Sequence, residues 1–195
     1  MSNVIRDGTG GRFDSQVYSD NKLATRSVTS TEQQDAVLDQ RAFNINTGWI
    51  NSISADSALI YFKNEEDEIF YLTSIAVGLK ESAATEIQGV YLVVQPTGGT
   101  LVGAATDCSM IENRYIGSGK GFGTSTLAYK ATASGQTLTG GRDAGLFAQA
   151  DGGRLFATVD FAIPKGQAVG IRIEVLGGFS DAVYAAIIGH KRRVL

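Results

Sequence analysis

The chain has 195 residues, of which 24 are glycine and 2 are proline, and its formal net charge is -3 at pH 7. This length fits one domain with an appended segment, and the small net charge excludes the strong positive field that draws nucleic acid or acidic membranes. One cysteine, Cys108, and one histidine, His190, exclude an intrachain disulfide and a four-ligand Cys/His zinc site. We also expect no membrane-spanning helix and no signal peptide, because long apolar runs are absent.

The first residues of the chain are polar and rich in glycine. Asp7-Gly8-Thr9-Gly10-Gly11 looks like a phosphate-binding loop, but such a loop needs a strand before it and a helix after it. The sequence predicts neither. Further on, Ser19–Lys22 is typical of a turn between the short β-prone runs Gln16–Tyr18 and Leu23–Val28. A two-stranded hairpin is marginal alone in water, so this one needs a surface to lie on.

A single short helix is predicted between residues 29 and 41. Thr29 and Glu32 have the spacing of a capping box, in which each side chain hydrogen-bonds a free backbone amide of the first turn. The run is short and mostly polar, so it supports at most one or two turns at the surface. We therefore expect an N-terminal arm over residues 1–41 and a separate body over residues 42–195.

The body is predicted to be all β. Short apolar or alternating runs are separated by turns rich in Gly, Asp, Ser and Thr, which is typical of an antiparallel β-sandwich of jelly-roll type. The predicted strands are Phe43–Asn46, Trp49–Ile53, Ala58–Phe62, Ile69–Leu79, Gly89–Gln95, Cys108–Ile111, Ser125–Lys130, Leu146–Gln149, Arg154–Ile163, Ala168–Val175 and Ala182–Ile188.

No catalytic residue, cofactor site or metal site is predicted. His190 is interpreted as a surface residue, and the basic run Lys191–Arg193 beside it as a solvated tail or as a partner for an acidic neighbouring subunit. Gly117–Gly121 contains a Gly-Lys pair but lacks the hydroxyl that a Walker A loop places on magnesium. Carboxylates such as Asp160 and Glu174 could pair, yet their spacing singles out no acid–base couple.

Two further features leave alternatives open. The acidic loop Glu65–Glu68 could hold calcium, but it lacks the spacing of a calcium loop, and a solvated turn is the favoured interpretation. Most aromatic residues lie inside strand-like runs and are expected to pack in the core. A carbohydrate site would need exposed aromatics, for which Phe122 and Phe179 in glycine-rich loops are the candidates.

Three ordered pieces of the sequence resemble virion structural proteins of tailed bacteriophages. They are Val4–Gly11, Val17–Thr29 and Phe43–Gly48, and they fit an arm of the form I-x-D-G-T-G, a V-x-x-x-N-x-L hairpin, an R-S-V-T segment and an N-I-N-T-G entry to a β domain. The resemblance ends at Gly48. The rest of the chain adds little to it, beyond turns such as Ile163–Gly166.

The resemblance implies a non-enzymatic virion protein, made in the host cytoplasm, that decorates and stabilises the capsid as a cement protein. The alternative is a head-fibre or tail component that binds a receptor or glycan. The implied partners are the major capsid protein and further copies of the chain, for example in a trimer, with no nucleic acid and no membrane. The arm residues expected to contact the shell are Val4, Ile5, Arg6, Arg12, Val17, Tyr18, Leu23, Arg26 and Val28.

Overall fold

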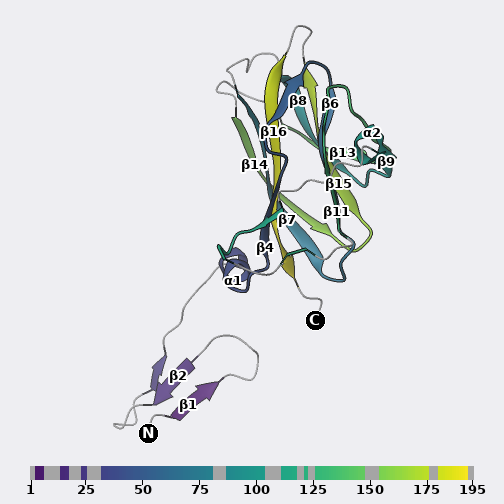
Figure 1. Ribbon diagram of the computed structural model, residues 1–195. Helices are drawn as coiled ribbons and strands as arrows, with labels where there is room; N and C mark the ends of the chain where they lie inside the picture. The colour runs from purple at the N-terminus through teal and green to yellow at the C-terminus, as the bar shows by residue number, and fades with distance from the viewer. Residues whose placement is uncertain are drawn as a thin grey trace. The chain divides into compact units, whose positions relative to one another are not determined.

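The protein was analysed as a computed structural model that describes residues 3–6, 14–17, 23–25, 32–80, 87–103, 111–117, 121–122, 126–147, 154–175 and 180–192 (Figure 1). Contacts divide the chain into two compact units, Met1–Asp35 and Ala36–Leu195. The division falls earlier than the predicted boundary after residue 41. Ala36 is fully buried, and its carbonyl accepts a hydrogen bond from the Arg41 amide, so the end of the helix belongs to the body.

The first unit contains a three-stranded antiparallel sheet of β1 (Asn3–Arg6), β2 (Asp14–Val17) and β3 (Leu23–Thr25). β2 and β3 pair with Val17 opposite Leu23, in agreement with the predicted hairpin. The prediction that no strand precedes Asp7–Gly11 is wrong, because β1 lies directly before it and pairs with β2. The segment that follows is a strand and not a helix, so the requirement of a phosphate loop is still unmet.

The structure contains two helices among its described residues, where at most one was predicted. The first, α1 (Glu32–Leu38), is shorter than predicted, and Thr29 of the expected capping box lies outside the described residues. The second, α2 (Thr100–Gly103), is a single turn whose Leu101 is fully buried. It follows β9 (Gly98–Gly99), which pairs with β12 (Leu138–Thr139). One helical turn has no amphipathic period, so the sequence pattern could not reveal it.

Two large antiparallel sheets make up most of the described body, and Figure 1 shows them lying against each other. The six-stranded sheet has the order β10-β4-β16-β7-β14, with β5 also paired to β16. The five-stranded sheet has the order β11-β6-β15-β8-β13. Their bounds are β4 Ala42–Asn46, β5 Ile50–Ile53, β6 Ser57–Lys63, β7 Ile69–Leu79, β8 Ile87–Val94, β10 Ile111–Asn113, β11 Leu127–Lys130, β13 Arg142–Phe147, β14 Arg154–Ile163, β15 Ala168–Val175 and β16 Asp181–Arg192.

One apolar core joins the two sheets. Phe62 of β6 and Phe70 of β7 are both fully buried, and their ring centroids are 5.0 Å apart. Burying a side chain of this size contributes roughly 1.5–3 kcal/mol. Burial patterns follow strand position: β6 is buried on both faces, whereas β14, at the edge, alternates exposed and half-buried residues. The alternation of β14 defines an outer face that includes Phe156 and an inner face that includes Leu155.

Candidate functional site

The residues predicted to anchor the arm fall partly within the small sheet of the first unit. Val4, Ile5 and Arg6 lie in β1, Val17 lies in β2 and Leu23 lies in β3. The strand order places β1 and β3 at the two edges of this sheet. An edge strand presents backbone donors and acceptors that can pair with a strand of another chain. The remaining anchor residues, Arg12, Tyr18, Arg26 and Val28, lie outside the described residues.

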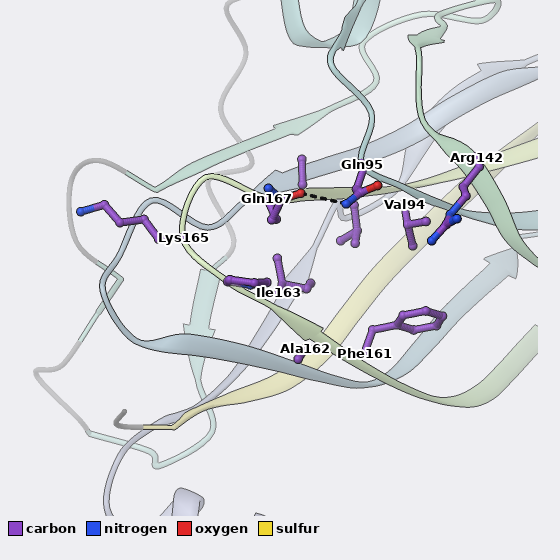
Figure 2. Close-up of a pocket in the computed structure, with 11 residues that line it drawn as sticks. Val94, Gln95, Arg142, Phe161, Ala162, Ile163, Lys165 and Gln167 are labelled. Carbon is purple, nitrogen blue, oxygen red and sulfur yellow. Dashed lines mark hydrogen bonds between the residues drawn. The ribbon is translucent and has the colours of Figure 1, made fainter. Parts of the chain in front are cut away.

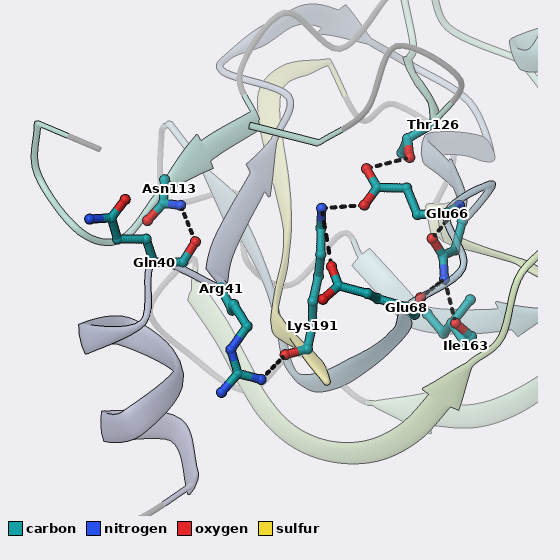
Figure 3. Close-up of polar contacts among 9 residues, drawn as sticks. Gln40, Arg41, Glu66, Glu68, Asn113, Thr126, Ile163 and Lys191 are labelled. Atoms are coloured by element: carbon teal, nitrogen blue, oxygen red, sulfur yellow. Dashed lines mark hydrogen bonds and ion pairs between the residues drawn. The ribbon is translucent and has the colours of Figure 1, made fainter. Parts of the chain in front are cut away.

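A buried lysine dominates one end of the body (Figure 3). Lys191 is 6% exposed and forms an ion pair with Glu66, while the Glu68 carboxylate lies 4.0 Å from its ammonium nitrogen. The same nitrogen lies 4.3 Å from the ring centroid of Phe122 and 5.1 Å from that of Phe43. The prediction of a solvated tail at Lys191 is therefore wrong, and its acidic partners come from the same chain.

The acidic loop matches the predicted solvated turn only in part, since the Asp67 side chain is 92% exposed whereas that of Glu65 is 25% exposed. Glu66 has a side chain that is 15% exposed and accepts a hydrogen bond from the Thr126 hydroxyl at 3.3 Å. Glu65 pairs with Lys63, and Asp67 pairs with Lys165 at 2.8 Å, which holds the pKa of Asp67 below its ordinary value. Each of these acids thus faces a lysine of its own chain. The cluster neutralises a buried cation and fastens the loop to β16, which is a structural task.

His190 is buried, so the prediction of a surface histidine is also wrong. Its ring stacks on that of Tyr71 with centroids 5.7 Å apart. β16 continues to Arg192, beyond the predicted end at residue 188, and pairs His190 with Tyr71. The histidine therefore lies within a packed sheet, stacked on Tyr71.

The outer face of the five-stranded sheet carries a closed polar network. Arg172 stacks over the ring of Tyr91 at 3.8 Å and donates hydrogen bonds of 2.8 Å to Asp143 and to Glu174. Tyr91 in turn donates a 2.7 Å hydrogen bond to Glu174. The hydrogen bonds from Arg172 and Tyr91 lower the pKa of Glu174, and the bond to Glu174 raises the pKa of Tyr91. An acid held in its ionised form by two donors is a poor proton donor, so this network offers no acid–base pair.

The outer face of the six-stranded sheet instead carries exposed rings. Trp49 is 48% exposed and Phe156 is 65% exposed. The ring of Trp49 meets that of Tyr184 edge-on, with centroids 5.2 Å apart. Tyr184 lies over Gly78 so closely that a Cβ there would fall 2.1 Å from a ring carbon. We call Trp49, Tyr184 and Phe156 the aromatic platform.

Hydrogen bonds fix the turn that presents Trp49. The buried Thr47 hydroxyl accepts a 2.9 Å bond from the Ala185 amide, and the Thr47 amide donates a 2.9 Å bond to the Ala185 carbonyl. The side-chain oxygen of Asn46 accepts a 3.1 Å bond from the amide of Gly48, whose φ of 60° is in the region that favours glycine. The N-I-N-T-G segment is therefore a rigid support for the tryptophan that follows it.

A pocket of 380 Å³ lies where the end of β14 meets the start of β15 and the end of β8 (Figure 2). Phe161, Ile163 and Val94 form part of an apolar lining, and the side chains of Gln95 and Gln167 are hydrogen-bonded to each other at 3.2 Å. Its charged lining residues, Arg142 and Lys165, are both cations. No acid–base pair therefore converges among the residues that line it.

The two aromatic residues predicted as candidates for a carbohydrate site can be compared with the structure only at Phe122. Phe122 is half-buried and packs against Phe43 with centroids 4.4 Å apart, and Phe179 lies outside the described residues. Trp49 and Phe156 were assigned to strands and to the core. The alternation of β14 could have indicated that Phe156 faces outward. Thr158 and Asp160, which share its face, are polar, whereas Leu155 and Ala157 on the other face are apolar.

Searches against protein-family models, curated proteins and solved structures each find no match to this chain. No helix in the described part of the chain is long and apolar enough to cross a membrane. Across the same residues, no group of three or more His, Cys, Asp or Glu side chains is placed to hold a metal ion.

Proposed function

We propose that the chain is a non-enzymatic structural protein of a tailed-bacteriophage virion that binds and stabilises the capsid shell through its N-terminal unit. The observation that carries the proposal is the division of the chain after Asp35, which leaves three short strands in a unit of their own. The resemblance of Val4–Gly11 and Val17–Thr29 to virion arms supports the same role. The chain would reside in the assembled particle after synthesis in the host cytoplasm.

We propose further that the body is a jelly-roll β-sandwich. Eight of its strands, in chain order β4, β6, β7, β8, β13, β14, β15 and β16, would form two four-stranded sheets. The neighbours β4-β16-β7-β14 in one sheet are then the first, eighth, third and sixth strands, and β6-β15-β8-β13 in the other are the second, seventh, fourth and fifth. This is the strand order of a jelly roll, an architecture found in viral capsid proteins and lectins. The fold alone does not assign a function, so the role rests on the arm.

The arm would bind by adding a strand to a sheet of the major capsid protein. β1 and β3 are edges of the small sheet, and main-chain pairing to an edge gives affinity without a large apolar surface. Arg6, Arg12 and Arg26 would pair with acidic groups of the shell. A symmetric oligomer such as a trimer would present several arms together and strengthen weak individual contacts by avidity.

Deletion of residues 1–28 tests this proposal. The shortened chain should keep the melting temperature of the full chain, because the body has its own core, and should no longer co-sediment with capsids. In the full chain, Ile5→Pro should weaken capsid binding by removing a backbone donor from β1, whereas Ile5→Val should leave binding unchanged. If the deletion variant bound capsids as well as the full chain does, the proposal that the arm binds the capsid would be refuted.

A further inference from the structure

We propose that the aromatic platform is a carbohydrate-binding site, on which an oligosaccharide lies across the six-stranded sheet. The apolar faces of its sugar rings would stack on Trp49, Tyr184 and Phe156, and its hydroxyl groups would meet the polar side chains around them. This site goes beyond the capsid-binding role of the arm, and it uses residues of the body only.

Register places the three rings in two neighbouring rows of the six-stranded sheet. Trp49 directly precedes β5, which pairs with β16 through Ile50 and Val183. Tyr184 of β16 lies opposite Gly78 of β7 and leans over it. Arg154 of β14 lies opposite Gly78, and Phe156 lies two residues further along β14, opposite Ala76. Neighbouring strands are about 4.8 Å apart, so the rings extend diagonally over three strands, which span about 10 Å of sheet from β16 to β14.

Small residues lie between the rings, and Ala76 and Ala186 are each only 8% exposed. Ala186 of β16 and Ala76 of β7 pair with each other and lead across the sheet to Phe156. In the next row along the strands, Thr158 is exposed and pairs with Ser74, which is only 8% exposed. Sugars present both C–H faces and hydroxyl groups, so exposed rings bordered by the Thr158 hydroxyl match their chemistry.

The platform is preorganised. Thr47 and Asn46 fix the turn before Trp49, and the missing side chain of Gly78 gives the Tyr184 ring its seat. Holding a ring in place before a ligand arrives reduces the entropy lost on binding. Since the tryptophan is 48% exposed, burial in the core does not account for this support.

A second copy of the chain fits this face less well. A stable protein interface buries about 800 Å² on each partner around a contiguous apolar centre. The exposed large apolar residues in the described part of the body are Leu38, Trp49, Tyr115, Ile116 and Phe156, and only Trp49 and Phe156 belong to the platform. Nucleic acid is disfavoured as well, because the chain is negatively charged overall.

The test uses the full chain, whose only tryptophan is Trp49. An array of bacterial-surface and host-cell glycans identifies the oligosaccharides that bind, and soluble forms of them are then titrated while tryptophan fluorescence is recorded. We expect saturable fluorescence changes. Stacking on an aromatic ring is worth about 0.5–1.5 kcal/mol, so Phe156→Ala should weaken binding by up to about tenfold, measured by the same signal. Trp49→Ala, measured by calorimetry, should weaken it at least as much.

Tyr115→Ala is the matched control. Tyr115 is 41% exposed but follows β10 at the opposite end of β4 from Trp49, so its removal should leave glycan binding unchanged. Melting temperatures check that the variants fold, and Phe156, exposed on an edge strand, can be replaced with little risk to folding. Absence of array binding by the native chain would overturn the proposal, and so would glycan binding by Phe156→Ala and Trp49→Ala that is as tight as binding by the native chain. So would self-association that Trp49→Ala abolishes in light scattering. None of these outcomes depends on capsid binding by the arm.

Discussion

The outer faces of the two sheets differ in how far their polar groups are paired and their aromatic rings are covered. On the five-stranded sheet, Arg172 stands on the ring of Tyr91 and satisfies two carboxylates, and Leu138 from β12 lies over Gly170. On the six-stranded sheet, Trp49 and Phe156 leave their rings in solvent. One face pairs its polar groups and covers its centre, while the other exposes apolar rings around small residues.

The difference indicates which face is available to a partner. Polar groups that already bind each other gain little from a new contact, because a ligand would have to replace existing hydrogen bonds. The exposed rings of Trp49 and Phe156 gain from any apolar surface that excludes water from them. The contrast therefore places the binding potential of the body on the six-stranded sheet, and three substitutions test it.

We expect the largest loss of stability from a substitution at Gly170, where Leu138 covers the five-stranded sheet. A Cβ at position 170 would lie 2.4 Å from a methyl carbon of Leu138 and 2.9 Å from the Ile60 carbonyl oxygen, which belongs to the backbone of β6. Gly170→Ala should therefore lower the free energy of unfolding by about 2–3 kcal/mol, measured by urea denaturation. Gly103→Ala is the control, since a Cβ there meets nothing within 4 Å. A Gly170→Ala variant as stable as the native protein would show that Leu138 of β12 can move away from the sheet at little cost in free energy.

We expect a smaller loss of stability from a substitution at Gly78 of the six-stranded sheet, which the Tyr184 ring approaches closely. A Cβ at position 78 would fall against the Tyr184 ring, which belongs to a side chain and can turn aside more easily than backbone can. We expect Gly78→Ala to cost about 1 kcal/mol of stability. It should also change the near-ultraviolet circular dichroism of the Trp49–Tyr184 pair. An unchanged aromatic spectrum would contradict the inference that the Tyr184 ring packs directly on Gly78.

Much of the β architecture could be predicted because its signals are local. Arg154–Ile163 and Ala168–Val175 match β14 and β15 residue for residue. The first is a long apolar-rich run, the second alternates toward its end, and Pro164 breaks the chain between them. Periodicity and turn residues determine where a strand begins and ends, whatever lies beside it.

Features that depend on which strands become neighbours could not be predicted. Lys191 meets Glu66 because β16 pairs with the start of β7, and nothing near Lys191 in the sequence indicates that pairing. The same holds for Trp49 and Tyr184, which come together across β5 and β16. Register between distant strands is set by the whole core, so the local sequence predicts a solvated tail at Lys191 and core packing at Trp49 and Phe156.

The smallest effect concerns the closed network and its dependence on pH. Hydrogen bonds from Arg172 and Tyr91 lower the pKa of Glu174 in the folded protein. The stabilisation they give is thus present above the ordinary glutamate pKa of about 4.3 and is lost as pH falls through the lower folded value. Because the Glu174 side chain is 32% exposed, we expect only a few tenths of a kcal/mol. Glu174→Gln should flatten the acidic part of a plot of melting temperature against pH.

Glu112→Gln, at the edge of the six-stranded sheet, is the control and should leave the plot unchanged, because no ion pair joins Glu112 to a described residue. Equal curves for native protein and Glu174→Gln would mean that the network contributes nothing to stability, and the two faces would then differ only in exposure.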